Sequence, residues 1–426
     1  MKAAVLGMAV LLIFLAQQTT PATGTISGSV VPDYTRLSVS LSRYTYDDNG
    51  ELKLIEVKTA RTSSEIGKFG EYRFDNVEPG EYYVSANPFG LSAPKGQVWT
   101  TTYYPGTVDL GKALRITLKP GDDLRLADLN FFPVPGSVAR IRLVDATGIP
   151  DLDKNCADVS LATPGSNFIT GISNCRKTGG TEGIPLPILA PGTYDVYAGW
   201  GGVPAGKVVY GTAVRFEVRN LDLEVEAVVS LAHVTGKISI EEPDGSLRPA
   251  AGVQLSLQPK RVGPAQWATT AADGSFRFDR VGQNDYTVEF TGLPADAYIA
   301  RLSDDKLNVL EGGMEVASTD VNLDGLISFA GGILEGSVRG PHRAIVALIP
   351  DLHGSSKHLY RSVTTDENGR FIIRAIAPGP YRLFAWSKLN GAAYKNADFM
   401  KPYEARGTAV VVEKNGRARI EAALLD

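Results

Sequence analysis

The sequence is poor in the residues on which common catalytic and metal sites depend. Its 426 residues include 2 cysteines, 4 histidines and 4 tryptophans. No histidine has a glutamate three positions later and no His-Glu-x-x-His occurs, so nothing indicates a peptidase zinc site. The Gly-x-Ser-x-Gly turn of serine hydrolases is missing as well. We therefore expect no catalytic residue, no metal site and no cofactor.

An excess of positive charge and long apolar runs are also missing. The 43 lysines and arginines nearly balance 47 acidic residues and form no long basic run, which argues against a nucleic-acid partner. Beyond residue 16 no stretch has the roughly 18 apolar residues of a membrane span. Glycine and proline are plentiful, at 45 and 25 residues, which favours many turns and short strands.

The N-terminus has the organisation of a secretory signal. Lys2 gives a positive start, and Ala3–Ala16 is an apolar run too short to span a membrane. Thr20 and Ala22 suit the −3 and −1 positions of a cleavage site, and the end of the apolar run is the alternative. No cysteine follows, so lipid attachment is not indicated. We predict a signal peptide over residues 1–22 and an exported protein that is periplasmic, outer-membrane-associated or extracellular.

Export makes the two cysteines informative. Cys156 and Cys175 lie 19 positions apart. An oxidising compartment favours a disulfide between them, and closing such a loop stabilises a fold by about 3 kcal/mol in the chain-entropy model. Two unpaired buried thiols are the alternative.

A pattern of apolar residues recurs four times along the chain. Its origins are Gly70, Glu182, Gly274 and Gly369, which are 112, 92 and 95 positions apart. Apolar residues occupy offsets +2, +4, +7, +12 and +14, and Pro-Gly stands at +9 and +10 in three copies. In the first copy these residues are Tyr72, Phe74, Val77, Tyr82 and Val84.

Each offset has a structural meaning. Alternation at +2/+4 and +12/+14 predicts two strands with one apolar face each. Pro-Gly fits a type II turn between them, and the tyrosine after it resembles a tyrosine corner, whose hydroxyl bonds back to the backbone. Opening strands with Gly-x-Val or Gly-x-Ile start at Gly28, Gly136, Gly236 and Gly336.

About seven short strands in 90–110 residues indicate a two-sheet sandwich. We predict an all-β protein of four tandem seven-stranded transthyretin-like or immunoglobulin-like β-sandwiches, with no helix after the signal. The predicted repeats 1 to 4 cover residues 24–133, 134–231, 232–332 and 333–426.

The succession Gly-x-Val, Asp/Asn-Gly-x-Phe-x-Phe/Ile and Val/Ile-x-Pro-Gly-x-Tyr-x-Val/Leu resembles the carboxypeptidase regulatory-like domain. This resemblance covers nearly all of residues 24–426. It implies a transthyretin-like sandwich, also grouped as a carbohydrate-binding-like fold, in a bacterial protein. Such domains accompany peptidases, outer-membrane receptors and adhesins without performing chemistry, so the likeness specifies fold better than function. Repeat 2 departs from the pattern because Glu182 replaces the origin glycine.

Two segments imitate ligand loops. Asp320–Gly325 matches the first half of a calcium loop, but its twelfth position is Gly331 where a glutamate is needed, and we predict a turn and strand there. Gly201–Lys207 has the spacing of a phosphate-binding loop, but Val208 replaces the serine or threonine that holds magnesium.

Aromatic residues outside the repeat positions are the best binding candidates, because sugars stack on flat rings and protein partners bind amphipathic anchors. These candidates are Trp99, Tyr103, Tyr104 and Trp386. Packing or contact between repeats is the alternative for each.

The sequence thus predicts a non-catalytic exported binding or scaffold protein, with carbohydrate or an envelope protein as partner. One alternative is a glycan-degrading enzyme with carboxylates in a cleft between repeats. Another is an accessory subunit of an outer-membrane receptor or transporter.

Overall fold

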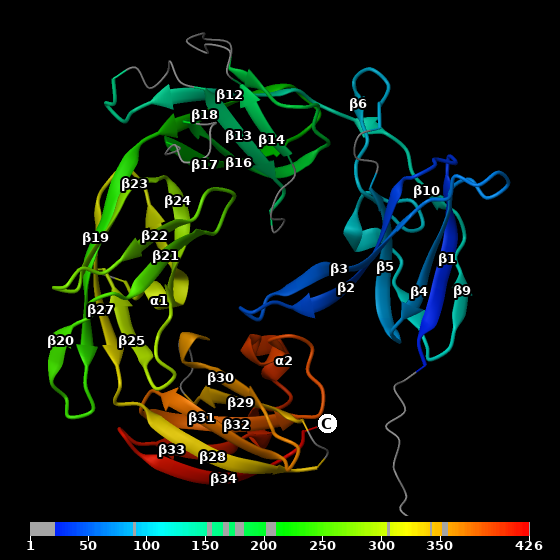
Figure 1. Cartoon of the computed structure of the whole chain (residues 1–426). Coiled ribbons are helices and arrows are strands. Elements are labelled where there is room, and N and C mark those ends of the chain that lie inside the picture. Colours follow the sequence, from blue (N-terminus) through cyan, green and yellow to red (C-terminus); the bar gives the residue numbers. More distant parts are fainter. Residues whose placement is uncertain are drawn as a thin grey trace, which may run out of the picture. The chain divides into compact units, whose positions relative to one another are not determined.

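A computed structural model describes residues 22–87, 91–150, 156–164, 170–174, 183–201, 210–304, 307–340, 343–351 and 357–425. Nearly all regular elements in these ranges are β-strands, which confirms the predicted all-β class (Figure 1). The expectation of no helix is wrong in detail, because α1 (Val309–Gly312) and α2 (Ala397–Met400) are single helical turns. Apart from Ala22, the predicted signal peptide lies outside the described residues.

The chain divides into two compact units. The first comprises Met1–Tyr44, Leu54–Leu91 and Trp99–Phe132. The second comprises Thr45–Lys53, Ser92–Val98 and Pro133–Asp426. The second unit therefore contains the whole of the predicted repeats 2, 3 and 4 and two short segments of repeat 1.

Repeat 1 contains two main sheets. In one, β1 pairs antiparallel with β4 and parallel with β9 and β10. In the other, β2 lies between β3 and β5, and β7 and β8 pair with β5. The bounds are β1 (Gly24–Val31), β2 (Ser38–Tyr46), β3 (Leu52–Arg61), β4 (Glu71–Val77), β5 (Gly80–Asn87), β7 (Thr102–Tyr103), β8 (Ile116–Leu118), β9 (Asp123–Arg125) and β10 (Leu129–Asn130); η1 is Leu110–Lys112, and β6 (Gln97–Val98) pairs with β11 (Val134–Pro135).

Repeats 2 to 4 each contain one sheet in which the opening strand pairs in parallel with the closing strand. These pairs are β12 with β18, β19 with β27 and β28 with β34. The bounds in these sheets are β12 (Ala139–Asp145), β15 (Ile184–Pro185), β18 (Leu223–Val229), β19 (Leu231–Glu241), β20 (Leu247–Pro249), β23 (Ser275–Gly282), β25 (Tyr298–Ser303), β27 (Val321–Ser328), β28 (Gly332–Arg339), β31 (Arg370–Ile376) and β34 (Arg417–Ala423).

The second sheet has four strands in each of these repeats, in the orders β14-β13-β16-β17, β22-β21-β24-β26 and β30-β29-β32-β33. Among the described residues, the two main sheets of repeat 2 and of repeat 4 contain seven strands, whereas β20 and β25 enlarge repeat 3 to sheets of five and four. The bounds are β13 (Ala157–Ala162), β14 (Thr170–Asn174), β16 (Gly192–Trp200), β17 (Tyr210–Val218), β21 (Gln254–Pro259), β22 (Gln266–Thr269), β24 (Asn284–Thr291), β26 (Met314–Val316), β29 (Ile345–Pro350), β30 (Arg361–Thr364), β32 (Gly379–Trp386) and β33 (Thr408–Val412).

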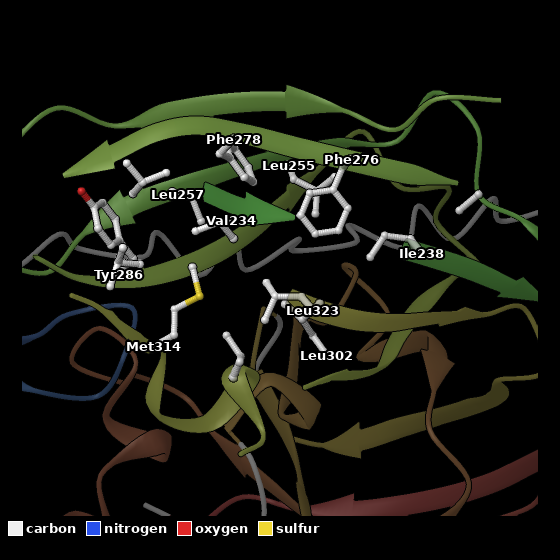
Figure 2. Close-up of a cluster of buried hydrophobic side chains, with 14 of the residues drawn as sticks. Val234, Ile238, Leu255, Leu257, Phe276, Phe278, Tyr286, Leu302, Met314 and Leu323 are labelled. Atoms are coloured by element: carbon white, nitrogen blue, oxygen red, sulfur yellow. The ribbon is translucent and has the colours of Figure 1, made fainter. Parts of the chain in front are cut away.

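The apolar residues of the repeat pattern are buried between the two sheets. In repeat 3, Phe276 and Phe278 of β23 meet Leu255 and Leu257 of β21, as Figure 2 shows. Separate buried clusters of the same kind occur in the other three repeats. Period-two alternation in the sequence therefore translates directly into core positions.

The opening glycines make room for the aromatic residue at +2. Gly236 is the register partner of Phe276, and a Cβ at position 236 would lie 2.7 Å from that ring. Gly336 stands in the same relation to Phe371, at 2.5 Å. An aromatic ring packed over a strand glycine fills the space that a side chain leaves empty, so the glycine and the ring form a matched pair.

The predicted tyrosine corner is present in all four copies. The hydroxyl groups donate hydrogen bonds to the carbonyl four residues upstream, at 2.7–3.1 Å: Tyr82 to Glu78, Tyr194 to Ala190, Tyr286 to Gly282 and Tyr381 to Ala377. Burial raises the pKa of Tyr286 and of Tyr381 to about 12.

The expected type II turn is not formed at Pro79-Gly80, because Gly80 begins β5 without a positive φ. Gly192 and Gly379 have a positive φ, but at 155° and 152° it differs from the value of about 80° in a type II turn. A left-handed residue recurs instead at offset +6, at Asn76, Arg280 and Ala375, with φ of 53–57°. The register with the opening strand shifts opposite these positions, which marks a β-bulge.

Candidate binding faces

Each sandwich buries one side of every sheet and leaves the other side available. In β21 of repeat 3, Leu255 and Leu257 point into the core, so Gln254, Ser256 and Gln258 lie on the outer side. The residues paired with these three across the sheet share that side. We call this set the Trp267 face; its members are Gln254, Ser256, Gln258, Trp267, Thr269, Thr287, Glu289 and Thr291.

Trp267 is the most prominent group on the Trp267 face. It is the register partner of Ser256, which in turn pairs with Glu289 of β24. The side chain of Trp267 is 72% exposed, whereas Ser256 between its neighbours is only 2% exposed. An indole of this exposure contributes nothing to the core and presents a flat apolar surface to solvent.

Polar groups surround the indole in two rows. The Gln258 amide donates to Ser256 Oγ at 3.1 Å, and Thr291 Oγ1 donates to Gln254 Oε1 at 3.3 Å. These contacts hold amide and hydroxyl groups in fixed positions on the sheet surface. The arrangement combines a stacking platform with hydrogen-bonding groups on a rigid element.

Trp267 was not among the predicted binding residues. Like Trp99, it is an aromatic residue outside the repeat positions, so the same criterion would have selected it. The signal that identifies its orientation is the alternation in Gln266–Thr269, where Ala268 packs against the core and Trp267 points the other way.

Two of the predicted aromatic residues pack inward. Trp99 lies in repeat 1 with its ring centroid 6.0 Å from Tyr34 and 5.1 Å from Phe131. Tyr104 also packs against the buried cluster of this repeat. The structure therefore gives both rings a packing contact, the alternative that the sequence had left open.

Tyr103 lies on the other side of its sheet from Tyr104. It is the register partner of Ser85 in β5, whose neighbours Tyr83 and Tyr44 form an edge-to-face pair at 5.6 Å. Burial and the nearby Tyr44 raise the pKa of Tyr103. Tyr103 thus joins an outward tyrosine group, while Trp99 and Tyr104 do not.

Trp386 lies on the outer side of β32 but is covered by its own chain. Residues 388–406, which we call the cap segment, contain η4 (Ala393–Lys395), α2 and η5 (Glu404–Arg406). Trp386 is 2% exposed and lies 5.5 Å from Tyr403 and 6.2 Å from Phe399 of this segment. Its indole Nε1 is buried without a hydrogen-bond partner. The ring has no free face for a ligand.

Repeat 4 also carries a charged hollow of about 1190 Å³ over β28, β31 and β34. Its charges largely pair with one another: Glu335 with Arg417 at 3.0 Å and Arg419 at 3.5 Å, and Arg339 with Glu421 at 2.5 Å. Ion pairs in such exposed positions contribute little to stability. The lining of the hollow also includes Asp366 and Arg370, so three carboxylates stand against two guanidinium groups.

The remaining sequence candidates have simple positions or lie outside the described residues. Val321–Ser328 is β27, paired with β19, so the strand predicted in place of a calcium loop is confirmed. Within the described ranges, no three histidine, cysteine, aspartate or glutamate side chains gather as a metal site. His342, His353, Cys175 and most of the phosphate-loop-like segment lie outside the described residues.

The predicted disulfide falls partly on a residue that is not described. Cys156 directly precedes β13, and Cys175 directly follows β14 in the sequence. The flanking residues Ala157 and Asn174 are register partners. The Cys156–Cys175 bridge stays a prediction.

No helix among the described residues is long and apolar enough to cross a membrane. A scan against protein-family models finds no match, and a search of curated proteins finds none either.

The sheets and cores define the chain as an all-β protein of two-sheet sandwiches. Solved structures similar to it include the Bacillus anthracis TIE protein, at 12% identity, with 96% of this chain and 73% of that chain covered and a TM-score of 0.19. Two B repeat units of the Staphylococcus aureus collagen-binding protein match at 13% identity, covering 87% and 93%, with a TM-score of 0.18. The major pilin RrgB from Streptococcus pneumoniae matches at 8% identity, covering 96% and 100%, with a TM-score of 0.17.

Proposed function

We propose that this chain is an exported, non-catalytic binding protein, in which four tandem sandwiches act as a scaffold for outward faces that bind carbohydrate or protein at the cell envelope. The observation that carries the proposal is the exposed aromatic group on a sheet whose core is already complete. Trp267, Tyr83 and Tyr103 are not members of the four buried clusters. Aromatic residues on the outer side of a sheet are suited to recognition.

The family proposal rests on the matched glycine–aromatic pairs and on the four tyrosine corners. Both belong to the motif by which the sequence resembles the carboxypeptidase regulatory-like domain. We propose membership of that family together with the signal peptide over residues 1–22 and the division into four repeats. The Cys156–Cys175 bridge belongs to the same proposal, because it would close the hairpin of β13 and β14 in an oxidising compartment.

A binding screen of the purified mature chain tests the function. The chain is run through gels containing soluble polysaccharides, and an envelope extract is passed over the immobilised chain. A binding protein is retarded, or retains a partner, without producing new reducing ends. Release of reducing sugar would instead support the glycan-degrading alternative. Absence of any retained glycan or envelope protein would contradict the proposal.

A further inference from the structure

From the Trp267 face we infer a binding site for an uncharged polysaccharide, with the indole of Trp267 as the stacking platform. This inference rests on the proposed function and specifies its ligand class and its site. The first step in the argument is the exposure of the indole itself. At 72% exposure, Trp267 leaves most of its ring open, so a flat ligand can stack on the indole.

The second step is the shape of the site. Trp267, Ser256 and Glu289 lie in one row across β22, β21 and β24. Neighbouring strands are about 4.8 Å apart, so the backbones at Trp267 and Glu289 are roughly 10 Å apart along this row. Ser256 between them is 2% exposed, so neighbouring side chains cover it and no hollow interrupts the row. A flat sugar ring can stack on the indole while the next sugar units meet the amide and hydroxyl groups beside it.

The third step is the charge of the Trp267 face. Its eight members include one carboxylate, that of Glu289, and no lysine or arginine. The neighbouring guanidinium of Arg261 is paired with Asp285 at 2.8 Å, so an anionic glycan or a nucleic acid would meet no unpaired cation among these eight residues and would be repelled by Glu289. The other polar members are amides and hydroxyl groups, which match the donors and acceptors of sugar hydroxyls. Charge complementarity thus selects a neutral, hydroxyl-rich chain.

The number of apolar side chains on the Trp267 face favours a glycan over a protein partner. Protein interfaces bury several apolar anchors within a continuous patch. On the Trp267 face the indole is the one large apolar side chain, and threonine, glutamine and serine surround it. One ring among hydrogen-bonding groups suits a single sugar ring better than a protein surface.

Titration of the full mature chain tests the inference. The probes are neutral polysaccharides (laminarin, xyloglucan, galactomannan and amylose), with alginate and polygalacturonate as anionic counterparts. Retardation in affinity gels gives the dissociation constant. Quenching of tryptophan fluorescence by acrylamide reports on Trp267 and on the half-buried Trp99, since Trp200 and Trp386 are buried, and the Trp267→Ala variant measures the share of Trp99. We expect at least one neutral polysaccharide to bind and to protect the fluorescence, and no anionic one to bind.

Variants assign the binding to this face. Trp267→Ala should weaken binding at least tenfold, and Trp267→Phe, which keeps a ring, should retain part of it. Leu247→Ala is the matched control, because Leu247 is a similarly exposed apolar residue of repeat 3 on the other sheet. It should bind as the unmodified chain does. All three variants should keep the unmodified melting temperature.

Three outcomes would overturn the inference. Equal binding by Trp267→Ala would show that the glycan site lies elsewhere, and would leave the proposed function intact. Capture of an anionic glycan or a protein through Trp267 would show that the ligand class is wrong, and would also leave the proposed function intact. Failure of the unmodified chain to bind any neutral polysaccharide overturns the inference, and only a simultaneous failure with envelope extract removes the proposed function too.

Discussion

Repeats 3 and 4 share the same four-stranded sheet, but its outer side is polar and exposed in repeat 3 and apolar and covered in repeat 4. In repeat 3 the outer residues of β24 that follow Tyr286 are Thr287, Glu289 and Thr291. The corresponding residues of β32 in repeat 4 are Arg382, Phe384 and Trp386. The outer residues of β24 are exposed to solvent beside the exposed Trp267, whereas those of β32 are covered by the cap segment.

The difference shows how one scaffold can assign a tryptophan to either stability or recognition. Trp386 stacks on Phe384 at 5.9 Å and completes a second buried cluster with Tyr394 and Met400. Trp267 has no such cluster above it. The outer residues of β24 and β32, rather than the tryptophan itself, decide whether the tryptophan is buried. Apolar outer residues bind a covering segment, whereas polar outer residues keep the face exposed to solvent.

Exchange of these outer residues should have the largest effect, because it should make the outer side of repeat 4 resemble that of repeat 3. Phe384→Glu together with Trp386→Thr gives β32 two of the three outer residues of β24. The cap segment then loses its apolar support and a carboxylate is left beneath it, so we expect it to detach, with a loss of more than about 4 kcal/mol in the free energy of unfolding. Trypsin should cut after Lys388, Lys395 or Arg406, whereas Lys401 is protected by the following Pro402. Cleavage no faster than in the unmodified chain would show that other contacts hold the cap segment.

Trp386→Ala alone should cost about 3–5 kcal/mol in the free energy of unfolding of repeat 4, because it leaves a cavity in the second cluster. Chemical denaturation followed by fluorescence measures this. Trp386→Phe is the control: it keeps an aromatic ring and removes the unpaired Nε1 donor, so its cost should be clearly smaller. Equal costs for the two variants would contradict the packing argument.

The tyrosine corner, which both repeats share, should respond alike in both. Tyr286→Phe and Tyr381→Phe each leave a carbonyl without its donor, and we expect a loss of about 1–3 kcal/mol in the free energy of unfolding. The pKa of each tyrosine is raised to about 12, against about 10 in the unfolded chain.

The corner also predicts a pH dependence. A raised pKa means that the folded state keeps the proton more tightly, so this contribution is complete below pH 10 and is lost as the pH rises towards 12. Denaturation midpoints between pH 8 and 11 should therefore fall less steeply in each phenylalanine variant than in the unmodified chain. Parallel slopes would show that these tyrosines do not titrate with unfolding.

The smallest stability effect is expected at Trp267. Trp267→Ala should change the free energy of unfolding by no more than about 0.5 kcal/mol, since the ring is exposed. The same chemical substitution thus costs several kcal/mol in repeat 4 and almost nothing in repeat 3. A large loss at Trp267 would mean that its ring supports the fold, and the contrast between the two faces would disappear.

The sequence predicts the features that a short local pattern encodes. The core positions of Phe276 and Phe278, and the hydrogen bond of Tyr286 to its upstream carbonyl, follow from fixed offsets. The left-handed position at +6 does not, because Asn76, Arg280 and Ala375 share no residue type that marks it. Positive φ at arginine or alanine comes from the bulge in the paired strands and not from local preference.

The sites were harder to predict for a different reason. Which side of a strand Trp99 or Tyr103 takes depends on the register of short, irregular strands after β5. The burial of Trp386 depends on the cap segment, whose sequence has no alternation that points to the sheet beneath it. The outward orientation of Trp267 could be predicted from strand alternation, because its neighbour Ala268 packs on the core.

The parallel pairing of first and last strands has a mechanical consequence. In repeats 2, 3 and 4 the chain enters at one end of this pair and leaves at the opposite end, over ladders such as Val234–Val321 to Glu241–Ser328. Tension on the ends of such a repeat loads all of these backbone bonds in shear at once, so that they cannot be unzipped one by one. The architecture suits a protein that must stay folded while it is pulled.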